Sequence, residues 1–185
     1  MQVDTVTGLL DVAQPRLSPH CDPRPAPHAI DLLVLHGISL PPGEFGGPWI
    51  DALFTSTLDC AAHPYFQTLS GVRVSAHLLI RRDGALLQYV PFTQRAWHAG
   101  ASSFEGRANC NDFSIGIELE GDDVTPYSDA QYRMLAPVVS SLMLAYPGIT
   151  PQRLVGHSDI APGRKTDPGP SFDWARLRAL LGQAQ

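Results

Sequence analysis

Two histidines stand at the ends of apolar segments of the same kind. His36 ends residues 32–36 (LLVLH), His157 ends residues 154–157 (LVGH), and each is followed by a loop. Side chains at strand ends often belong to functional sites, because the sheet fixes them while the loops shape a pocket. Asp167 follows ten residues after His157, in the segment GRKTDPGP. Two imidazoles and one carboxylate predict a three-ligand zinc site with a fourth position open to water, although the same donors also suit other divalent metals.

Glu118 is the second candidate for chemistry. In residues 113–120 (FSIGIELE) apolar and polar or small side chains alternate, as in a strand with two different faces. Glu118 shares its face with Gly116, which leaves room above the sheet. A carboxylate placed there would serve as a general base or acid, with a pKa raised by a dry site. Two simpler interpretations stay open: Glu118 is an exposed carboxylate paired with an arginine, and each histidine is a core residue rather than a ligand.

The other histidines have no such partners in the sequence. We interpret His77 as a core residue, or as one that holds a ligand or a substrate group from behind. His98 has no evident partner, and three further histidines that lie among prolines are predicted at the surface: His20, His28 and His63.

Lys165 is the only lysine in a chain with twelve arginines. A genome-wide base bias explains most of this imbalance. Where such a bias replaces most lysines by arginine, a retained lysine can mark a position that needs a compact point charge on a flexible stem. Lys165 is therefore a candidate site residue, although on composition alone it is equally well an ordinary surface charge.

Several strands are predicted around these residues. Residues 32–36 are apolar on both sides, which is typical of a strand in the middle of a sheet. Residues 113–120 form the clearest strand, and residues 72–80 and 85–90 flank an Arg-Asp-Gly turn that predicts a β-hairpin. Residues 153–160 hold a further short strand.

Three helices are predicted between the strands. They span residues 49–59, residues 129–146 after a capping box at Ser128, and residues 173–181. Pro137 predicts a kink or a break near Ala136. Residues 36–49 and 97–111 are long loops. Strands interleaved with helices predict an α/β domain with one central mixed β-sheet flanked by helices.

Composition narrows the class of protein. The chain has 185 residues, 44% of them hydrophobic, which fits one globular domain. Eight of the seventeen prolines lie in the first 48 residues, so we expect residues 1–30 to form an extended arm packed on a domain of residues 31–182. A net charge of −5 argues against binding to nucleic acid.

Location and redox state are predicted in the same way. No apolar run is long enough for a membrane helix, and no signal peptide is recognisable, so a cytoplasmic protein without membrane contact is expected. The three cysteines are odd in number and lack a CxxC motif, so reduced thiols are expected. No obligate protein partner is evident.

Longer segments resemble a known family. The strings LHGISLPPGEFGGPW, VSAHLLIRRDG, YVPFTQRAWHAG, NDFSIGIELEG and GHSDIAPGRKTDPGPSFDW resemble the AmpD-type N-acetylmuramyl-L-alanine amidases. These are zinc amidases related to T7-type lysozyme and to the peptidoglycan recognition proteins. The resemblance runs in order from about Leu32 to Trp174, which is most of the chain.

The resemblance implies roles for individual residues. His36, His157 and Asp167 match the zinc ligands, Glu118 matches the carboxylate that activates the attacking water, and Lys165 matches the residue that stabilises the charge developing on the attacked carbonyl. Further residues are implied or considered as substrate contacts. Trp97 and Arg73 match positions of the family that contact the muropeptide, and Arg107 could bind a peptide carboxylate. At Gly37 and Asn109 the chain departs from the family, which puts its affinity for the sugar or the peptide in doubt.

The resemblance also implies a function. The family cleaves the amide between the lactyl group of N-acetylmuramic acid and L-alanine, and members of this kind favour the 1,6-anhydro sugar. They act in cytoplasmic cell-wall recycling and thereby limit β-lactamase induction. The expected ligands are thus one Zn²⁺ per chain and a muropeptide substrate.

Three other functions fit the sequence less well. A non-catalytic muropeptide-binding module would lack a ligand or the base, but all of them are present here. A secreted or phage-type amidase that acts on intact peptidoglycan is disfavoured by the missing signal peptide. A zinc deacetylase of sugar N-acetyl groups would share the metal but not the long strings.

Overall fold

A six-stranded sheet with the order β12-β5-β11-β6-β7-β3 runs through the structure, a computed structural model that describes residues 1–25 and 29–183. Four neighbouring strands are parallel to one another: β12 (Leu154–Gly156), β5 (Leu32–Ile38), β11 (Ser114–Glu120) and β6 (Leu78–Ile80). β7 (Leu86–Gln88) is antiparallel to β6, and β3 (Gln14–Pro15) is parallel to β7. The predicted mixed sheet is confirmed.

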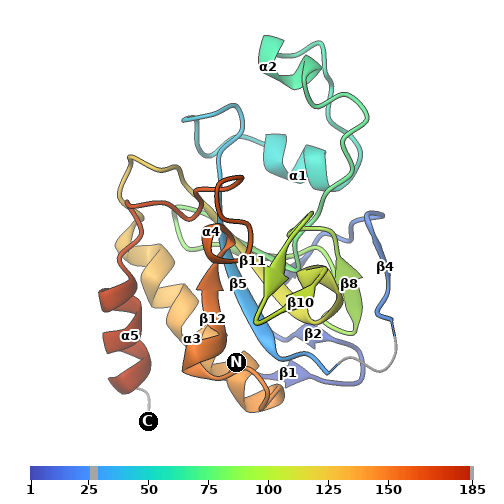
Figure 1. Cartoon of the computed structure of the whole chain (residues 1–185). Coiled ribbons are helices and arrows are strands. Elements are labelled where there is room, and N and C mark those ends of the chain that lie inside the picture. The colour runs from blue at the N-terminus through green and yellow to red at the C-terminus, as the bar shows by residue number, and fades with distance from the viewer. Residues whose placement is uncertain (26–28, 184–185) are drawn as a thin grey trace.

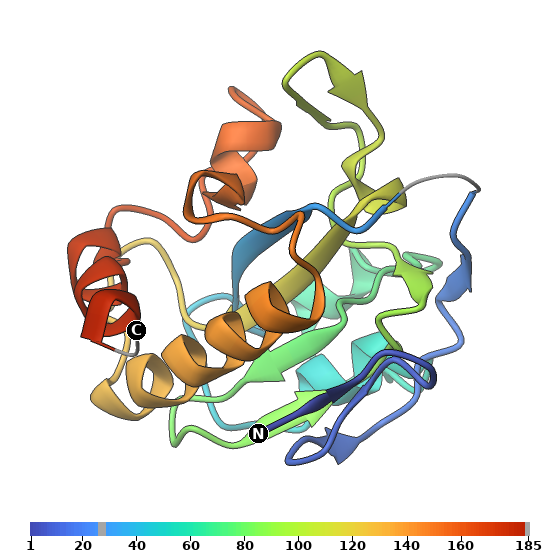
Figure 2. The same ribbon diagram turned by 90° about the horizontal axis from the view of Figure 1, so that it is seen from below.

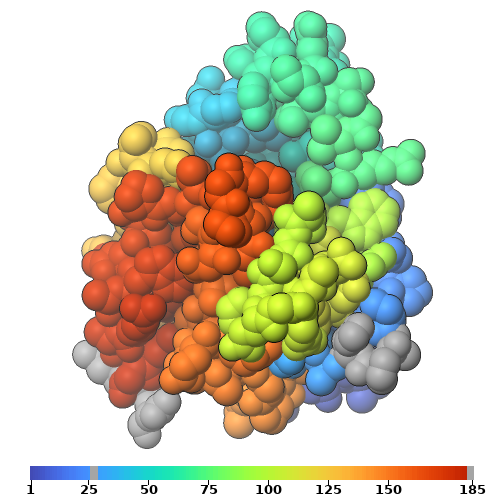
Figure 3. Space-filling model, in the orientation of Figure 1, coloured from blue at the N-terminus to red at the C-terminus, as the bar shows by residue number. Residues whose placement is uncertain are grey.

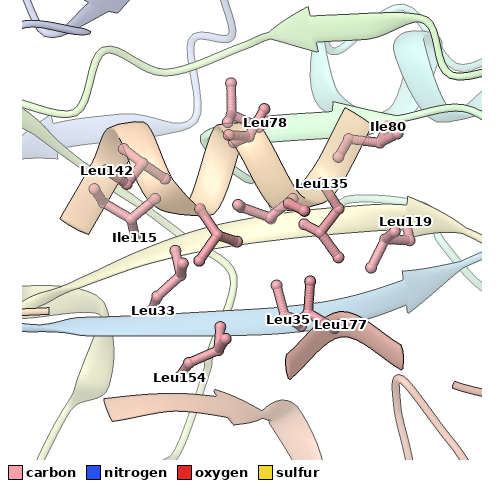
Figure 4. Close-up of a cluster of buried hydrophobic side chains, with 14 of the residues drawn as sticks. Leu33, Leu35, Leu78, Ile80, Ile115, Leu119, Leu135, Leu142, Leu154 and Leu177 are labelled. Atoms are coloured by element: carbon pink, nitrogen blue, oxygen red, sulfur yellow. The ribbon is translucent and has the colours of Figure 1, made fainter. Parts of the chain in front are cut away.

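The two central strands, β5 and β11, are buried on both faces, as the apolar run of β5 predicts. Their odd-numbered leucine and isoleucine residues, such as Leu33 and Ile115, belong to the main core cluster. Figure 4 shows this core, in which Leu135 and Leu142 of the long helix α3 and Leu177 of α5 contact side chains of β5 and β11. The other face of the two strands carries the residues that form the site.

Two helices cover the core face of the sheet. α3 (Asp129–Ala145) and α5 (Trp174–Gln183) lie side by side, and α3 runs along the sheet (Figures 1 and 2). The capping box at Ser128 is present: its hydroxyl accepts from the Gln131 N–H, and the Gln131 side chain accepts from the Ser128 N–H. Of the predicted kink or break near Ala136, the break is absent: α3 continues through Pro137, because the packing of its apolar face outweighs one lost helical hydrogen bond.

The site face is covered by loops and short helices. α1 (Trp49–Phe54) is shorter than predicted and α2 (Pro64–Gln67) is a single turn; both lie beyond one end of the sheet (Figure 1). The loop of residues 97–111 carries a small hairpin of β9 (Ser103–Phe104) and β10 (Arg107–Ala108), then the 3-10 helix η1 (Cys110–Asp112). In Figure 3 this hairpin lies against the segment around α4 (His157–Ile160). A second 3-10 helix, η2 (Pro151–Arg153), precedes β12.

The first 25 residues are more structured than an extended arm. β1 (Val3–Asp4) pairs with β2 (Leu9–Leu10), β3 joins the main sheet, and β4 (Cys21–Pro23) pairs with β8 (Gln94–Ala96). The domain boundary at residue 30 stays a prediction. Cys21, Cys60 and Cys110 are free thiols. Within the described residues, no helix is both long and apolar enough to cross a membrane.

Candidate metal centre and active site

The carboxyl ends of the parallel strands bring the candidate residues together. In the register of β5 and β11, His36 lies directly opposite Glu118, so both side chains point to the same face of the sheet. Gly156 of β12 lies opposite Leu35, which places the next residue, His157, beside His36. His157 was predicted to end a strand, but it is the first residue of α4, because the Asp159 carboxylate accepts the Gly156 N–H and starts a helical turn there.

Three donor atoms converge at this edge. His36 Nδ1 lies 2.9 Å from His157 Nδ1 and 3.2 Å from Asp167 Oδ2, and His157 Nδ1 lies 3.0 Å from Asp167 Oδ2. The Asp167 loop is held in place because its carbonyl accepts the Ser158 N–H. Ligands at 2.0–2.1 Å from a tetrahedral zinc would be about 3.3 Å apart, so the cluster fits a zinc ion with a small outward adjustment.

The burial and protonation of His36 also suit a cation. His36 is 1% exposed and His157 3% exposed. Burial lowers the pKa of His36 to about 4, although the nearby Asp167 carboxylate opposes this, so the imidazole is neutral at pH 7. Neutral imidazole is the form that binds metals. The three residues are therefore a possible metal site of two histidines and one aspartate.

Glu118 is a buried carboxyl group beside this cluster. Its side chain is 9% exposed, and its Oε2 has no hydrogen-bond partner among the described residues. Burial raises the pKa of Glu118 well above its usual range, the charge of Asp167 raises it further, and Lys165 opposes both. An unpartnered oxygen with a raised pKa is suited to accepting and returning a proton near pH 7. The interpretation of Glu118 as an exposed, arginine-paired carboxylate is wrong.

A cavity of about 170 Å³ opens at the cluster. Glu118, His157, Asp167 and Lys165 line it together with Trp97 and Gly37, so six of the residues predicted from the sequence share one cavity wall. Its remaining wall comes from Ile38, Phe54, Val74, Ser75 and His98.

Comparison with known proteins identifies the family. The model of the N-acetylmuramoyl-L-alanine amidase family matches residues 26–170. The chain belongs to this amidase family. It is 63% identical, over 94% of its length and 92% of the relative, to the 1,6-anhydro-N-acetylmuramyl-L-alanine amidase AmpD of Citrobacter freundii.

Solved structures agree with this family. A crystal structure of a selenomethionine derivative of AmpD has a TM-score of 0.94 and 62% identity, with 98% of this chain and 99% of that chain covered. The amidase AmiD of E. coli, in a complex with anhydro-N-acetylmuramic acid-L-Ala-D-γ-Glu-L-Lys, has a TM-score of 0.60 and 30% identity, with 93% of this chain and 60% of that chain covered.

Three residues predicted as substrate contacts lie outside the cavity of this amidase. Arg73 is exposed and lines a second cavity of about 170 Å³, together with His20. Arg107 Nη1 lies 2.6 Å from Asp31 Oδ2, and the guanidinium stacks on Phe113. Asn109 has a left-handed backbone (φ 58°) ahead of η1.

Gly37 has a structural reason to lack a side chain. A Cβ at this position would lie 2.3 Å from the hydroxyl of Tyr127, a residue that the sequence reasoning missed. That hydroxyl donates to the Pro168 carbonyl at 3.0 Å, next to Asp167. In this amidase the space beside His36 is therefore filled by a tyrosine from the loop before α3.

His77 does not touch the donor atoms. It is fully buried, and its Nδ1 accepts the Gly116 N–H at 3.0 Å. Its Nε2 lies 3.1 Å from the Gln94 carbonyl and 3.0 Å from the Arg24 guanidinium. His77 thus links β11 to the N-terminal segment of the amidase.

His98 is a second residue of the site that the sequence pattern did not indicate. Its Nδ1 lies 2.9 Å from His36 Nε2, and its ring lies over Gly116. The only signal in the sequence was its place directly after Trp97, in a long loop. Among the three histidines predicted at the surface, His20 is buried (5% exposed) and stacks on Trp97, His63 is half-buried, and His28 lies outside the described residues.

Proposed function

We propose that this amidase is zinc-dependent and cleaves the lactyl–L-Ala amide of 1,6-anhydromuropeptides in cytoplasmic cell-wall recycling, which would limit β-lactamase induction. One observation carries the proposal: Glu118, whose buried Oε2 has no hydrogen-bond partner among the described residues, lines the same cavity as His157 and Asp167 of the cluster of two histidines and one aspartate. The names of AmpD and the ligand of the AmiD complex support the choice of substrate.

His36, His157 and Asp167 would hold the zinc through Nδ1, Nδ1 and Oδ2. When bound, zinc acts as a Lewis acid toward a carbonyl oxygen and lowers the pKa of water to about 7. His36 lies on the sheet, His157 begins α4, and the loop of Asp167 is bonded to α4 through the Ser158 N–H, so little reorganisation is needed when the metal enters. The same donor set also suits other divalent metals.

Glu118 would move the proton during the reaction. Its unpartnered oxygen takes a proton from the attacking water and later delivers one to the nitrogen of the leaving L-alanine. Without that delivery the amine would have to leave as an unstable anion. The raised pKa of Glu118 favours uptake of the water proton and keeps that proton on the carboxyl group until it is delivered to the amine.

Trp97 and Arg73 are the substrate contacts that we propose. Trp97 forms part of the cavity wall, where its ring offers an apolar surface. Arg73 lies in the second cavity, whose His20 stacks on Trp97, so an acidic peptide that extends from the first cavity can reach its guanidinium. Arg107 is paired with Asp31 and is not part of this proposal.

The choice between substrates is tested by two assays run side by side. Purified enzyme is given a 1,6-anhydromuropeptide or intact sacculi, and release of the peptide is followed by chromatography. We expect efficient cleavage of the soluble anhydromuropeptide and little release from sacculi. Equal or faster release from sacculi would support the phage-type or secreted amidase instead. No cleavage of either substrate by zinc-loaded enzyme would favour the binding module.

Replacement of Lys165 tests whether its charge acts in the transition state. Lys165 is an exposed residue on the cavity wall, where its ammonium can stabilise the oxygen that becomes negative when the carbonyl is attacked. Lys165→Ala should lower kcat about 10²–10³-fold and change KM much less. Lys165→Arg should recover only part of the rate, because the wide planar guanidinium replaces a point charge. A fully active arginine variant would show that any positive charge near the site suffices.

A further inference from the structure

Two acceptors that are adjacent in sequence face the outer nitrogens of the two histidine ligands. His36 Nε2 lies 2.9 Å from His98 Nδ1, and His157 Nε2 lies 3.1 Å from the Ala99 carbonyl oxygen. The Asn111 side-chain oxygen accepts the backbone N–H groups of His98 and Ala99, at 3.1 and 2.8 Å. One short segment of the loop is therefore held rigidly behind both ligands.

The Cys110 carbonyl sets the direction of the hydrogen bonds that connect it, through Ser114 and His98, to His36. The Cys110 carbonyl can only accept, so the Ser114 hydroxyl, 2.6 Å away, donates its single proton to it. The Ser114 oxygen is then free only to accept, and the group 3.1 Å from it is His98 Nε2, which must carry a proton. A neutral His98 protonated on Nε2 has a bare Nδ1, which accepts the proton of His36 Nε2.

The surroundings favour this neutral arrangement. Ser114 is fully buried and His98 is 9% exposed. Among the described residues, no carboxylate forms a hydrogen bond with the His98 ring. The ring lies over Gly116, where a Cβ would approach its Cγ to 2.4 Å, so the glycine of β11 makes room for His98 in this orientation. Ser114 and Gly116 alternate with core residues on β11, which places both on the site face.

We propose that His98 and Ser114 are positioning residues that fix the Nε2–H tautomer of His36, so that its Nδ1 lone pair faces the metal. The Ala99 carbonyl does the same for His157. This inference rests on the metal site of the proposed function, and it adds residues that are not themselves metal ligands. Acceptors for the outer N–H of a metal-bound histidine fix its orientation, and their loss typically lowers metal affinity about 10–100-fold.

The first test reads the tautomers without metal or substrate. Nitrogen shifts of the imidazoles are measured by NMR in zinc-free, ¹⁵N-histidine-labelled protein at neutral pH. We expect His98 as the Nε2–H tautomer, with a bare Nδ1. In Ser114→Ala, His98 should lose this preference. A His98 protonated on Nδ1 in the wild-type protein would overturn the proposal, whatever the enzyme cleaves.

The second test compares zinc affinities by competition with a chelator. His98→Phe keeps a ring but removes the acceptor, so zinc should bind about 10–100-fold more weakly. His98→Asn places an amide oxygen near the former Nδ1 and should recover part of the affinity. Leu142→Ala, a core change in α3, serves as the control for lost stability and should keep wild-type affinity. Equal affinity in His98→Phe and wild type, or equal losses in the two His98 variants, would reduce His98 to a packing residue. Should His98→Phe not fold, Ser114→Ala takes its place and is expected to weaken zinc binding.

Discussion

Alanine at His36, His157 or Asp167 is expected to remove bound zinc and amidase activity together. Zinc sites in proteins use three or four protein ligands, so a site that is reduced to two ligands holds the ion poorly. Zinc content is measured by metal analysis after dialysis, and activity is measured on an anhydromuropeptide. The loss of activity should be complete within detection for each variant.

His63→Ala is the matched control for this experiment. His63 is a half-buried histidine whose ring accepts the Tyr65 N–H at the start of α2, and it does not line the cavity. This variant should keep one zinc per chain. A variant of His36, His157 or Asp167 that retained full zinc would remove that residue from the ligand set.

Glu118→Gln should keep zinc and fold but lose about 10²–10⁴ of the rate. The amide has nearly the same shape as the carboxyl group, but it cannot accept the proton of the attacking water. The measurement is kcat on an anhydromuropeptide, together with zinc content.

Glu120→Gln is a control on the same face of β11. This buried carboxylate accepts the backbone N–H groups of Gly46 and Arg82 and does not line the cavity. Its loss should therefore affect stability more than rate.

The Glu118→Gln variant has a second readout in zinc-free protein. Burial raises the pKa of Glu118 in the folded state, so folding favours its protonated form. Stability is therefore highest below the unfolded pKa and falls as pH rises through the folded pKa. Glu118→Gln removes this penalty and should unfold at a higher denaturant concentration than wild type at pH 8. In the activity measurement, near-wild-type turnover by zinc-loaded Glu118→Gln would mean that another group is the base.

Local sequence patterns predicted much of the frame that carries the site. The apolar run before His36 and the alternation around Glu118 predicted two strands correctly, and the capping box at Ser128 predicted the start of α3. These predictions worked because periodicity and end signals depend on residues that are close in the chain. They were weaker at Pro137, where packing on the sheet outweighed a local signal.

Tertiary structure alone decided which of the candidate residues meet. His36 and Glu118 face each other because β5 and β11 are parallel in one register, which no local pattern specifies. The same packing brought His98 behind His36 and paired Arg107 with Asp31 instead of leaving it free for substrate.

The sequence by itself thus indicated the candidate residues of the site, the strands that carry them and, through long ordered segments, the family. It did not determine the hydrogen bonds behind the ligands or the tyrosine that fills the space beside Gly37. Those contacts join residues far apart in the chain, and they exist only because burying the apolar faces of β5, β11 and α3 brings distant loops to one edge of the sheet.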